Sequence, residues 1–394
     1  MEKIKAVHYA RKQADYSPAE KFGTRQAEGV RRFHASFPEY AATPLVQLPG
    51  LAAKLGVKNI YLKDESYRFG LNAFKVLGGS YALGRYIAQK LHIPLSELTY
   101  AKLVSSEVKQ ALGDVTFVTA TDGNHGRGVA WTANRLGQHC VVYMPKGSAA
   151  ERLHNIQALG AEASISELNY DDAVRLAAAN SARYGWVMVQ DTAWEGYEEI
   201  PTWIMQGYTT MAHEVMAQLA GVRPTHIFLQ AGVGALAGAV TGFFTDLYKD
   251  ARPIITIVEP NAADCIYQTG LANDGSLHPV TGDLRTIMAG LACGEPCTIG
   301  WEMLRRYADN FVSMPDEVAA TGMRVLARPC AGDKQVISGE SGAATMGLVA
   351  EVMQRPELAW LREQLKLDAN SIVLCLSTEG ATDRENYRKI VDDL

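Results

Sequence analysis

Residues 116–145, TFVTATDGNHGRGVAWTANRLGQHCVVYMP, decide the fold class. A short apolar run, Thr116–Ala120, leads into a glycine-rich turn and then into a segment with helical periodicity. Three apolar residues of this segment share one helical face: Val129, Ala133 and Leu136. Gly137 stands where a helix C-cap is expected, and a second apolar run, Cys140–Met144, follows it. The order strand, helix, strand predicts an α/β unit with parallel strands.

Similar apolar runs recur along the chain, and most are followed by a turn residue and a helical pattern. They are Asn59–Lys63, Val187–Gln190, His226–Gln230, Ile254–Val258 and Ile372–Leu376. This alternation predicts an α/β fold with mostly parallel sheets flanked by helices. Ligands bind at the carboxyl ends of the strands in such sheets, so the residues that follow each strand are the candidates for function.

The composition is typical of a large folded protein that binds neither nucleic acid nor membrane. Of its 394 residues, 47% are apolar and 21% are charged, so the chain can bury a sizeable core, in two or three domains or in one large domain with a subdomain. The net charge of −5 provides no positive field for nucleic acid or an anionic membrane. The uncharged stretch Ile227–Thr245 contains four glycines and is interpreted as strand, turn and helix rather than a membrane span. The polar first residues lack the apolar core of a secretory signal, which predicts a cytoplasmic protein.

A lysine that follows the strand Asn59–Lys63 is the first candidate for chemistry. Lys75 stands between Phe74 and Val76, and an amine in such an apolar setting loses hydration, so its pKa falls. A lysine with a lowered pKa is nucleophilic enough for Schiff-base chemistry. Considered alone, Lys75 is more typical of an ordinary lysine that extends from an apolar helix face into solvent.

The turn after Thr116–Ala120 is the second candidate. Its glycines let the backbone approach a ligand closely, Asn124 offers a donor and an acceptor, and Asp122 adds a carboxylate. A turn in which Asp122 is a helix N-cap is the alternative. For His125 alone, a structural hydrogen bond is more typical than catalysis, and no metal site is predicted from the spacing of histidines and cysteines.

A glycine-rich turn after His226–Gln230 predicts a phosphate-binding loop, because free N–H groups where a turn opens a helix attract anions. The loop residues are Gly232, Val233, Gly234, Ala235 and Leu236. With Gly238 and with Glu259 at the end of the next strand, the loop also imitates a dinucleotide fingerprint. The last glycine is one position away from that pattern, which favours phosphate binding over NAD.

Two further strand ends carry polar side chains. Four carboxylates lie between residues 190 and 201: Asp191, Glu195, Glu198 and Glu199. Such a cluster suits a substrate with extra positive charge, although a solvated loop with capping carboxylates has the same composition. Ser377 and Thr378 follow Ile372–Leu376, where a hydroxyl can hydrogen-bond a ring nitrogen or cap a helix.

In this order, the motifs resemble the fold-type II pyridoxal-phosphate enzymes, the group of tryptophan synthase β, threonine dehydratase and cysteine synthase. The resemblance runs through most of the chain and is clearest over residues 119–145. It implies an α/β fold of two unequal domains with the cofactor between them, small amino-acid substrates and a homodimer. The small domain is expected at residues 74–201, and the large domain at residues 1–73 and 202–394.

The resemblance also implies a role for each matching residue. Lys75 corresponds to the lysine that holds pyridoxal 5'-phosphate covalently, and Asn124 to the asparagine that contacts the pyridoxal hydroxyl. The loop from Gly232 to Leu236 corresponds to the phosphate-binding loop. The hydroxyl that faces the pyridine nitrogen corresponds to Ser377, with Thr378 as the other choice.

Departures from the dehydratases indicate the substrate. Ala73 stands where dehydratases usually have a serine, and Asp122 stands where they usually have a small residue. In these positions and in segment 190–201, the chain is similar to the ammonia-lyases of this group that act on 2,3-diaminopropionate. The similarity implies α,β-elimination of that substrate, in one or both enantiomers, to pyruvate and two ammonia. Asp122 and Asp191 would then compensate the second ammonium of the substrate.

The proton transfers are expected to involve three residues. Lys75 would remove the Cα proton from one enantiomer and Asp122 from the other, while Asp191 would orient the β-amino group or share in proton transfer. The alternatives are a serine or threonine dehydratase of the same fold, an NAD-dependent oxidoreductase suggested by the fingerprint-like glycines, and a non-enzymatic binding protein. A chromophore that borohydride reduces onto Lys75 would distinguish the pyridoxal enzymes from the oxidoreductase.

Overall fold

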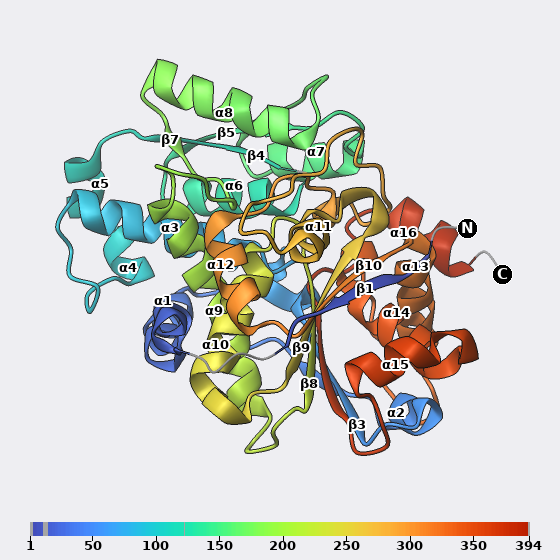
Figure 1. The fold of residues 1–394 in the computed structure, drawn as a ribbon. Coiled ribbons are helices and arrows are strands. Elements are labelled where there is room, and N and C mark those ends of the chain that lie inside the picture. The colour runs from blue at the N-terminus through green and yellow to red at the C-terminus, as the bar shows by residue number, and fades with distance from the viewer. Residues whose placement is uncertain (1–2, 11–14, 122, 393–394) are drawn as a thin grey trace.

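The computed structural model of the protein describes residues 3–10, 15–121 and 123–392, which form two β-sheets surrounded by helices (Figure 1). The larger sheet has seven strands in the order β1-β10-β9-β8-β11-β3-β2, and the smaller has four in the order β6-β5-β4-β7. The strands of the larger sheet are β1 (Lys5–His8), β2 (Leu45–Gln47), β3 (Asn59–Asp64), β8 (His226–Gln230), β9 (Ile254–Pro260), β10 (Asn310–Met314) and β11 (Ile372–Ser377). Those of the smaller sheet are β4 (Thr116–Ala120), β5 (His139–Met144), β6 (Glu162–Ile165) and β7 (Val187–Met188).

The helices fall into two groups along the chain. Those between β3 and β7 are α3 (Val76–Lys90), α4 (Tyr100–Leu103), α5 (Ser106–Leu112), α6 (Asn124–Arg135), α7 (Ala150–Gln157) and α8 (Tyr170–Tyr184). The others are α1 (Thr24–Ala35), α2 (Pro49–Leu55), α9 (Glu199–Gln218), α10 (Ala235–Tyr248), α11 (Cys265–Ala272), α12 (Thr298–Tyr307), α13 (Asp316–Ala327), α14 (Glu340–Gln354), α15 (Ala359–Leu365) and α16 (Arg384–Asp392).

The larger sheet is parallel except at its two edges. Its five central strands run parallel, whereas β1 pairs antiparallel with β10, and β2 pairs antiparallel with β3. Helices cover both faces of this sheet, with α13, α14 and α15 on one side and α9 and α10 on the other (Figure 1). The sheet therefore separates two hydrophobic clusters, and all five residues of β8 are buried between them, as is typical of central parallel strands.

The smaller sheet is parallel throughout, with α8 on one side and α6 on the other (Figure 1). The strand–helix–strand unit predicted for residues 116–145 is confirmed as β4, α6 and β5. The strand predicted at Val187–Gln190 ends at Met188 instead. The Gln190 N–H donates to the Tyr197 hydroxyl at 2.8 Å and not to a neighbouring strand, so the ladder stops before it.

The α/β fold with parallel-rich sheets and flanking helices is confirmed. Residues 74–201 contain all of the smaller sheet, while the larger sheet takes its strands from both flanking segments; the domain boundaries themselves stay a prediction. Ile227–Thr245 forms most of β8, a turn and most of α10. Within residues 3–10, 15–121 and 123–392, no helix is long and apolar enough to cross a membrane.

Close contacts at glycine hold α3 against α6. A Cβ on Gly128 would lie 2.8 Å from Val76 Cα, and a Cβ on Gly79 would lie 3.3 Å from the backbone carbonyl carbon of Gly128. A side chain at Gly128 would therefore push the two helices apart. Because α3 begins directly after Lys75 and α6 begins at Asn124, this contact sets the N-termini of the two helices side by side.

A buried cluster of charged side chains supports the segment that leads to Lys75. Lys63 Nζ and Arg68 Nη2 both bond to Glu214 Oε2, at 2.6 and 2.7 Å. Arg68 Nε also bonds to Glu65 Oε2 at 2.8 Å, and each of these four side chains is at most 2% exposed. Burial alone would raise the pKa of Glu214, but its bonds to Arg68 and Lys63 hold that pKa well below its usual range. The cluster joins β3 and the short helix Glu65–Gly70 to α9.

Candidate active site

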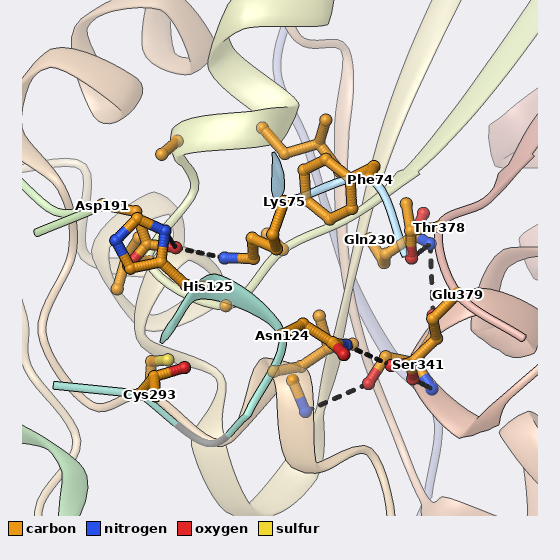
Figure 2. A pocket seen from close by; sticks show the side chains of 18 of the residues that line it. Phe74, Lys75, Asn124, His125, Asp191, Gln230, Cys293, Ser341, Thr378 and Glu379 are labelled. Atoms are coloured by element: carbon orange, nitrogen blue, oxygen red, sulfur yellow. Dashed lines mark hydrogen bonds and ion pairs between the residues drawn. The ribbon is translucent and has the colours of Figure 1, made fainter. Parts of the chain in front are cut away.

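A cavity of about 670 Å³, counted with its open mouth, lies at the carboxyl ends of strands from both sheets. Thr121 after β4, the turn after β8 and Thr378 after β11 form part of its walls, as expected for a ligand site of parallel sheets. Lys75, Asn124 and Asp191 also line it (Figure 2). The topology therefore brings together candidates from all five motifs.

Lys75 extends into the cavity toward Asp191, and its ammonium forms an ion pair with the Asp191 carboxylate (Figure 2). The ring of Phe74 lies 5.5 Å from the same ammonium. Burial by itself raises the pKa of Asp191, but His125 and Lys75 outweigh it and hold the pKa at about 2. Asp191 is therefore ionised over the whole neutral range, although it is only 3% exposed.

His125 lies beside Asp191 but is not hydrogen-bonded to it. His125 Nδ1 is 3.8 Å from Asp191 Oδ2, and Nε2 donates to the Val189 carbonyl at 2.8 Å. Burial lowers the pKa of His125, so its imidazole is neutral at neutral pH. The direct ion pair of Asp191 is therefore with Lys75.

Tyr170 and Gln190 hold Asp191 in place, and no sequence motif indicated Tyr170. The Tyr170 hydroxyl donates to Asp191 Oδ1 at 3.3 Å, and Gln190 Nε2 donates to the Tyr170 oxygen at 2.9 Å. Gln190 Nε2 also donates to the Ala120 carbonyl at 3.0 Å, which ties the group to the end of β4. The signal that could have found Tyr170 is its place at the start of α8, at the same sheet edge as the other site residues.

The turn after β8 forms a cradle for an anion at the start of α10. Gly234 has a φ of +91°, which residues with a side chain rarely adopt, and Ala235 begins the helix. The N–H groups of the first helical turn have no partner within the helix, so they can bind a phosphate. A Cβ on Gly232 would lie 3.2 Å from both the Gly290 carbonyl oxygen and Cys293 Sγ, so glycine is needed for the turn to come this close. The donor set of the loop fits a phosphate group.

Glu259 is not placed to bind a ribose, as the dinucleotide alternative requires. Its two carboxylate oxygens accept hydrogen bonds from the backbone N–H groups of Ile266 and Tyr267, at 2.8 and 2.6 Å. Glu259 therefore caps the start of α11, and burial raises its pKa well above the usual value. The fingerprint-like glycines thus form a phosphate cradle without the acid that NAD binding needs.

Of the two hydroxyls at the end of β11, the structure brings Thr378 to the cavity. Gln230 Nε2 donates to Thr378 Oγ1 at 2.9 Å, which leaves the Thr378 hydroxyl hydrogen to donate into the cavity (Figure 2). Ser377, the first choice from the sequence, is fully buried, and its hydroxyl donates to Ser338 Oγ at 2.7 Å. Successive side chains of a strand point to opposite faces, so Ser377 and Thr378 cannot both face the cavity.

Asn124 and Glu379 meet at the far wall of the cavity from Asp191 (Figure 2). Asn124 Nδ2 donates to Glu379 Oε2 at 2.5 Å, and Glu379 Oε1 accepts from the Ser341 N–H at 3.1 Å. Glu379 was not predicted as a site residue, although it directly follows the hydroxyls at the end of β11. Asp122, predicted as a catalytic carboxylate, lies outside the described residues.

Glu340, the first residue of α14, is a second buried carboxyl; it lies next to the lining residue Ser341 in the sequence but does not itself line the cavity. One of its oxygens accepts a hydrogen bond from Asn386. Burial, together with the charge of Glu379, raises the pKa of Glu340 to about 7. Because this folded-state pKa lies above the unfolded value, Glu340 favours the folded state at acidic pH, and that contribution is lost as the pH rises through about 7.

Glu340→Gln should therefore weaken the pH dependence of stability. We expect the thermal-unfolding midpoint of the wild type to fall between about pH 5 and about pH 8 as Glu340 ionises, and we expect a smaller fall in the variant. Differential scanning fluorimetry at both pH values measures this difference. An equal fall in the two proteins would mean that the ionisation of Glu340 does not contribute.

The sequence of the chain is similar to one family of known proteins and to two characterised enzymes within it. A family described as pyridoxal-phosphate dependent enzyme matches residues 37–366. The chain is 52% identical to the diaminopropionate ammonia-lyase of Escherichia coli (strain K12) over 94% of this chain and 92% of that protein. It is 53% identical to the enzyme of the same name from Salmonella typhimurium, over 92% of this chain and 91% of that protein.

Solved structures agree with the sequence comparison. The holo diaminopropionate ammonia lyase from Escherichia coli superposes with a TM-score of 0.91 at 49% identity, over 99% of this chain and 97% of that one. A structure of that enzyme in complex with an aminoacrylate–PLP azomethine reaction intermediate has a TM-score of 0.89 at 47% identity and the same coverage. Threonine deaminase isoform 2 from Solanum lycopersicum shares the fold alone, with a TM-score of 0.73 at 19% identity over 98% of this chain and 96% of that one.

Proposed function

The chain belongs to the pyridoxal-phosphate dependent enzymes and, among them, to the diaminopropionate ammonia-lyases, and on that premise we propose how its residues act. It is a carbon–nitrogen lyase that uses pyridoxal 5'-phosphate to eliminate ammonia from 2,3-diaminopropionate. The observation that supports our assignment of residues is the ion pair of Lys75 and Asp191, which shares one cavity with the anion cradle at 232–236.

The polar groups of the cavity match those of the cofactor. The cradle at the start of α10 would take the phosphate, and Lys75 Nζ would hold the aldehyde carbon covalently. The Thr378 hydroxyl would donate to the ring nitrogen, and Asn124 would contact the ring hydroxyl. When bound, the cofactor accepts the electron pair that remains on Cα after proton loss.

Lys75 and Asp122 divide the removal of the Cα proton in this proposal. The Lys75 amine, once released by the substrate, takes the proton of one enantiomer, and the Asp122 carboxylate takes that of the other. Asp191 is ionised and buried, so it binds the second ammonium of the substrate when Lys75 no longer pairs with it. The Cβ–N bond then breaks and its electrons leave on ammonia. Water hydrolyses the released 2-aminoacrylate to pyruvate and a second ammonia.

The test of the function is product release from D- and L-2,3-diaminopropionate, with serine and threonine in parallel. We expect pyruvate and ammonia in a ratio of one to two, chiefly from the diamino acid. A serine or threonine dehydratase, the second candidate, would instead release one ammonia per keto acid and prefer the hydroxy amino acids. Turnover chiefly of serine or threonine would reject the roles proposed for Asp122 and Asp191.

Asp122→Asn should separate the two enantiomers. We expect kcat/KM to fall by about 10²-fold or more for the enantiomer whose proton Asp122 removes, and to change little for the other, because an amide cannot act as a base. Asp114→Asn is the matched control, since Asp114 is an exposed aspartate before β4. Equal losses for both enantiomers, with the cofactor still bound, would contradict the division of roles.

We also propose that the enzyme is a cytoplasmic homodimer with domain boundaries near residues 74 and 201. The resemblance to fold-type II enzymes supports the dimer, and the confinement of the smaller sheet to residues 116–188 supports the boundaries. Light scattering of the purified holoenzyme tests the dimer. A mass of 42.9 kDa, that of one chain, would reject it.

A further inference from the structure

One buried carboxylate joins three parts of the cavity wall. Glu379 is 2% exposed, and its Oε2 accepts from Asn124 Nδ2 while its Oε1 accepts from the Ser341 N–H (Figure 2). Its backbone forms a bridge with Ala73, two residues before Lys75. Glu379 therefore contacts the lysine segment, the asparagine turn of the smaller sheet and the start of α14 on the larger sheet.

The bond to Asn124 decides which end of the asparagine amide faces the carboxylate. An amide has an N–H₂ end that donates and a C=O end that accepts, and the two have nearly the same shape. A carboxylate only accepts, so Glu379 holds the Nδ2 end. Nδ2 has two hydrogens, and Glu379 Oε2 takes one of them. The second hydrogen remains available to a group in the cavity.

The surroundings of Glu379 keep its carboxylate in this position. A Cβ on Gly339 would lie 3.2 Å from Glu379 Oε1, so glycine there leaves room for the carboxylate. The Thr382 hydroxyl is 3.4 Å from Glu379 Oε2 and in turn accepts from Arg152 Nη2 at 3.2 Å. Arg152 is a cation on α7, and Glu340 is the neighbouring acid on α14. Arg152 is therefore linked to Glu379 through Thr382, and the charge of Glu379 raises the pKa of Glu340.

We propose that Glu379 is a positioning residue, which orients the Asn124 amide so that an N–H and not a carbonyl oxygen faces the ring hydroxyl of the cofactor. This inference rests on the contact proposed above between Asn124 and that hydroxyl. A donated N–H stabilises the ionised ring oxygen, whereas a carbonyl oxygen would repel it. Without the carboxylate, the amide is free to turn its acceptor end toward the ring.

Glu379→Gln tests this role, because glutamine keeps the size of the side chain but can present either a donor or an acceptor to Asn124. We expect the pH midpoint of the absorption change of the bound cofactor to rise by about one unit, and the Kd of pyridoxal 5'-phosphate for the apoenzyme to rise about tenfold. We also expect kcat to fall more than KM rises. Glu340→Gln is the matched control, as the same substitution at the adjacent buried carboxyl, and it should leave the absorption midpoint in place.

Combining variants separates this role from a merely structural one. In an Asn124→Ala background, Glu379→Gln should have no further effect on the absorption midpoint, because both changes remove the same contact. The inference would be overturned if the two substitutions shifted the absorption midpoint additively. It would also be overturned if Asn124→Ala shifted the midpoint and Glu379→Gln did not. If Asn124→Ala itself leaves the midpoint unchanged, the inference fails together with the proposed contact of Asn124. A failure of the enzymatic assignment would be visible separately, as wild-type protein that releases no pyruvate from 2,3-diaminopropionate.

Discussion

Replacing Lys75 by alanine should lower kcat/KM for 2,3-diaminopropionate by at least about 10⁴-fold. The substitution removes both the covalent attachment of the cofactor and the base for one enantiomer. It also leaves Asp191 buried without the ammonium with which it forms an ion pair. No other lysine lines the cavity among the described residues, so no neighbouring amine can replace Lys75.

Borohydride reduction identifies the attachment site directly. Reduction of the wild type should fix the chromophore on the peptide that contains Lys75, and the alanine variant should retain no covalent label. Lys146→Ala is a suitable control, because the Lys146 side chain is 70% exposed. Label on another lysine of the wild type, or activity in Lys75→Ala within tenfold of the wild type, would contradict the assignment.

Replacing Glu214 by glutamine should lower the free energy of unfolding by about 3–5 kcal/mol. Glutamine leaves Arg68 and Lys63 fully buried with Glu65 as the remaining carboxylate of the cluster. A buried charge that has lost its partner still carries the free-energy penalty of its removal from water. Removing one partner therefore lowers the free energy of unfolding by more than the intact pair adds to it. The shift of the urea-unfolding midpoint measures the loss.

The same experiment has an internal check in its pH dependence. The depressed pKa of Glu214 gives stability that is fully present above the unfolded pKa of about 4.5 and is lost as the pH falls through the folded pKa of about 2, so wild type and variant should converge in acid. Glu107→Gln serves as the control, since its bond to Lys102 is on the surface and its side chain is 77% exposed. We expect no measurable change there. A midpoint for Glu214→Gln equal to that of the control would refute the role of the cluster.

The local patterns of the sequence predicted the elements of the fold but not every side chain of the site. Strand β4, helix α6 and the turn that opens α10 follow from apolar periodicity and glycine, which act over a few residues. Tyr170 reaches the cavity only through the tertiary packing of α8, so its neighbours in the sequence do not reveal it. Glu379 follows two predicted hydroxyls, but its bond to Asn124 depends on tertiary packing.

Two strand ends show where such reasoning needs three-dimensional information. The sequence favoured Ser377 over Thr378, but the phase of alternation in β11 places Thr378 in the cavity. Glu259 matched the position of a ribose-binding acid, yet it caps α11. A carboxylate at a strand end serves either purpose, and only the position of the next helix distinguishes them.

The pairing of β3 with β11 has a consequence for the order in which the protein is made. The register pairs Asn59 of β3 with Ile372 of β11. β3 therefore cannot form this pairing until more than three hundred further residues have been synthesised. The smaller sheet needs no such partner, since β4 to β7 are contiguous along the chain and can assemble while the ribosome is still translating. Thr378 and Glu379 arrive with the late strand. An incomplete chain therefore presents Lys75 and Asn124 without the wall that completes their site, and the nascent enzyme is inactive until β11 is inserted.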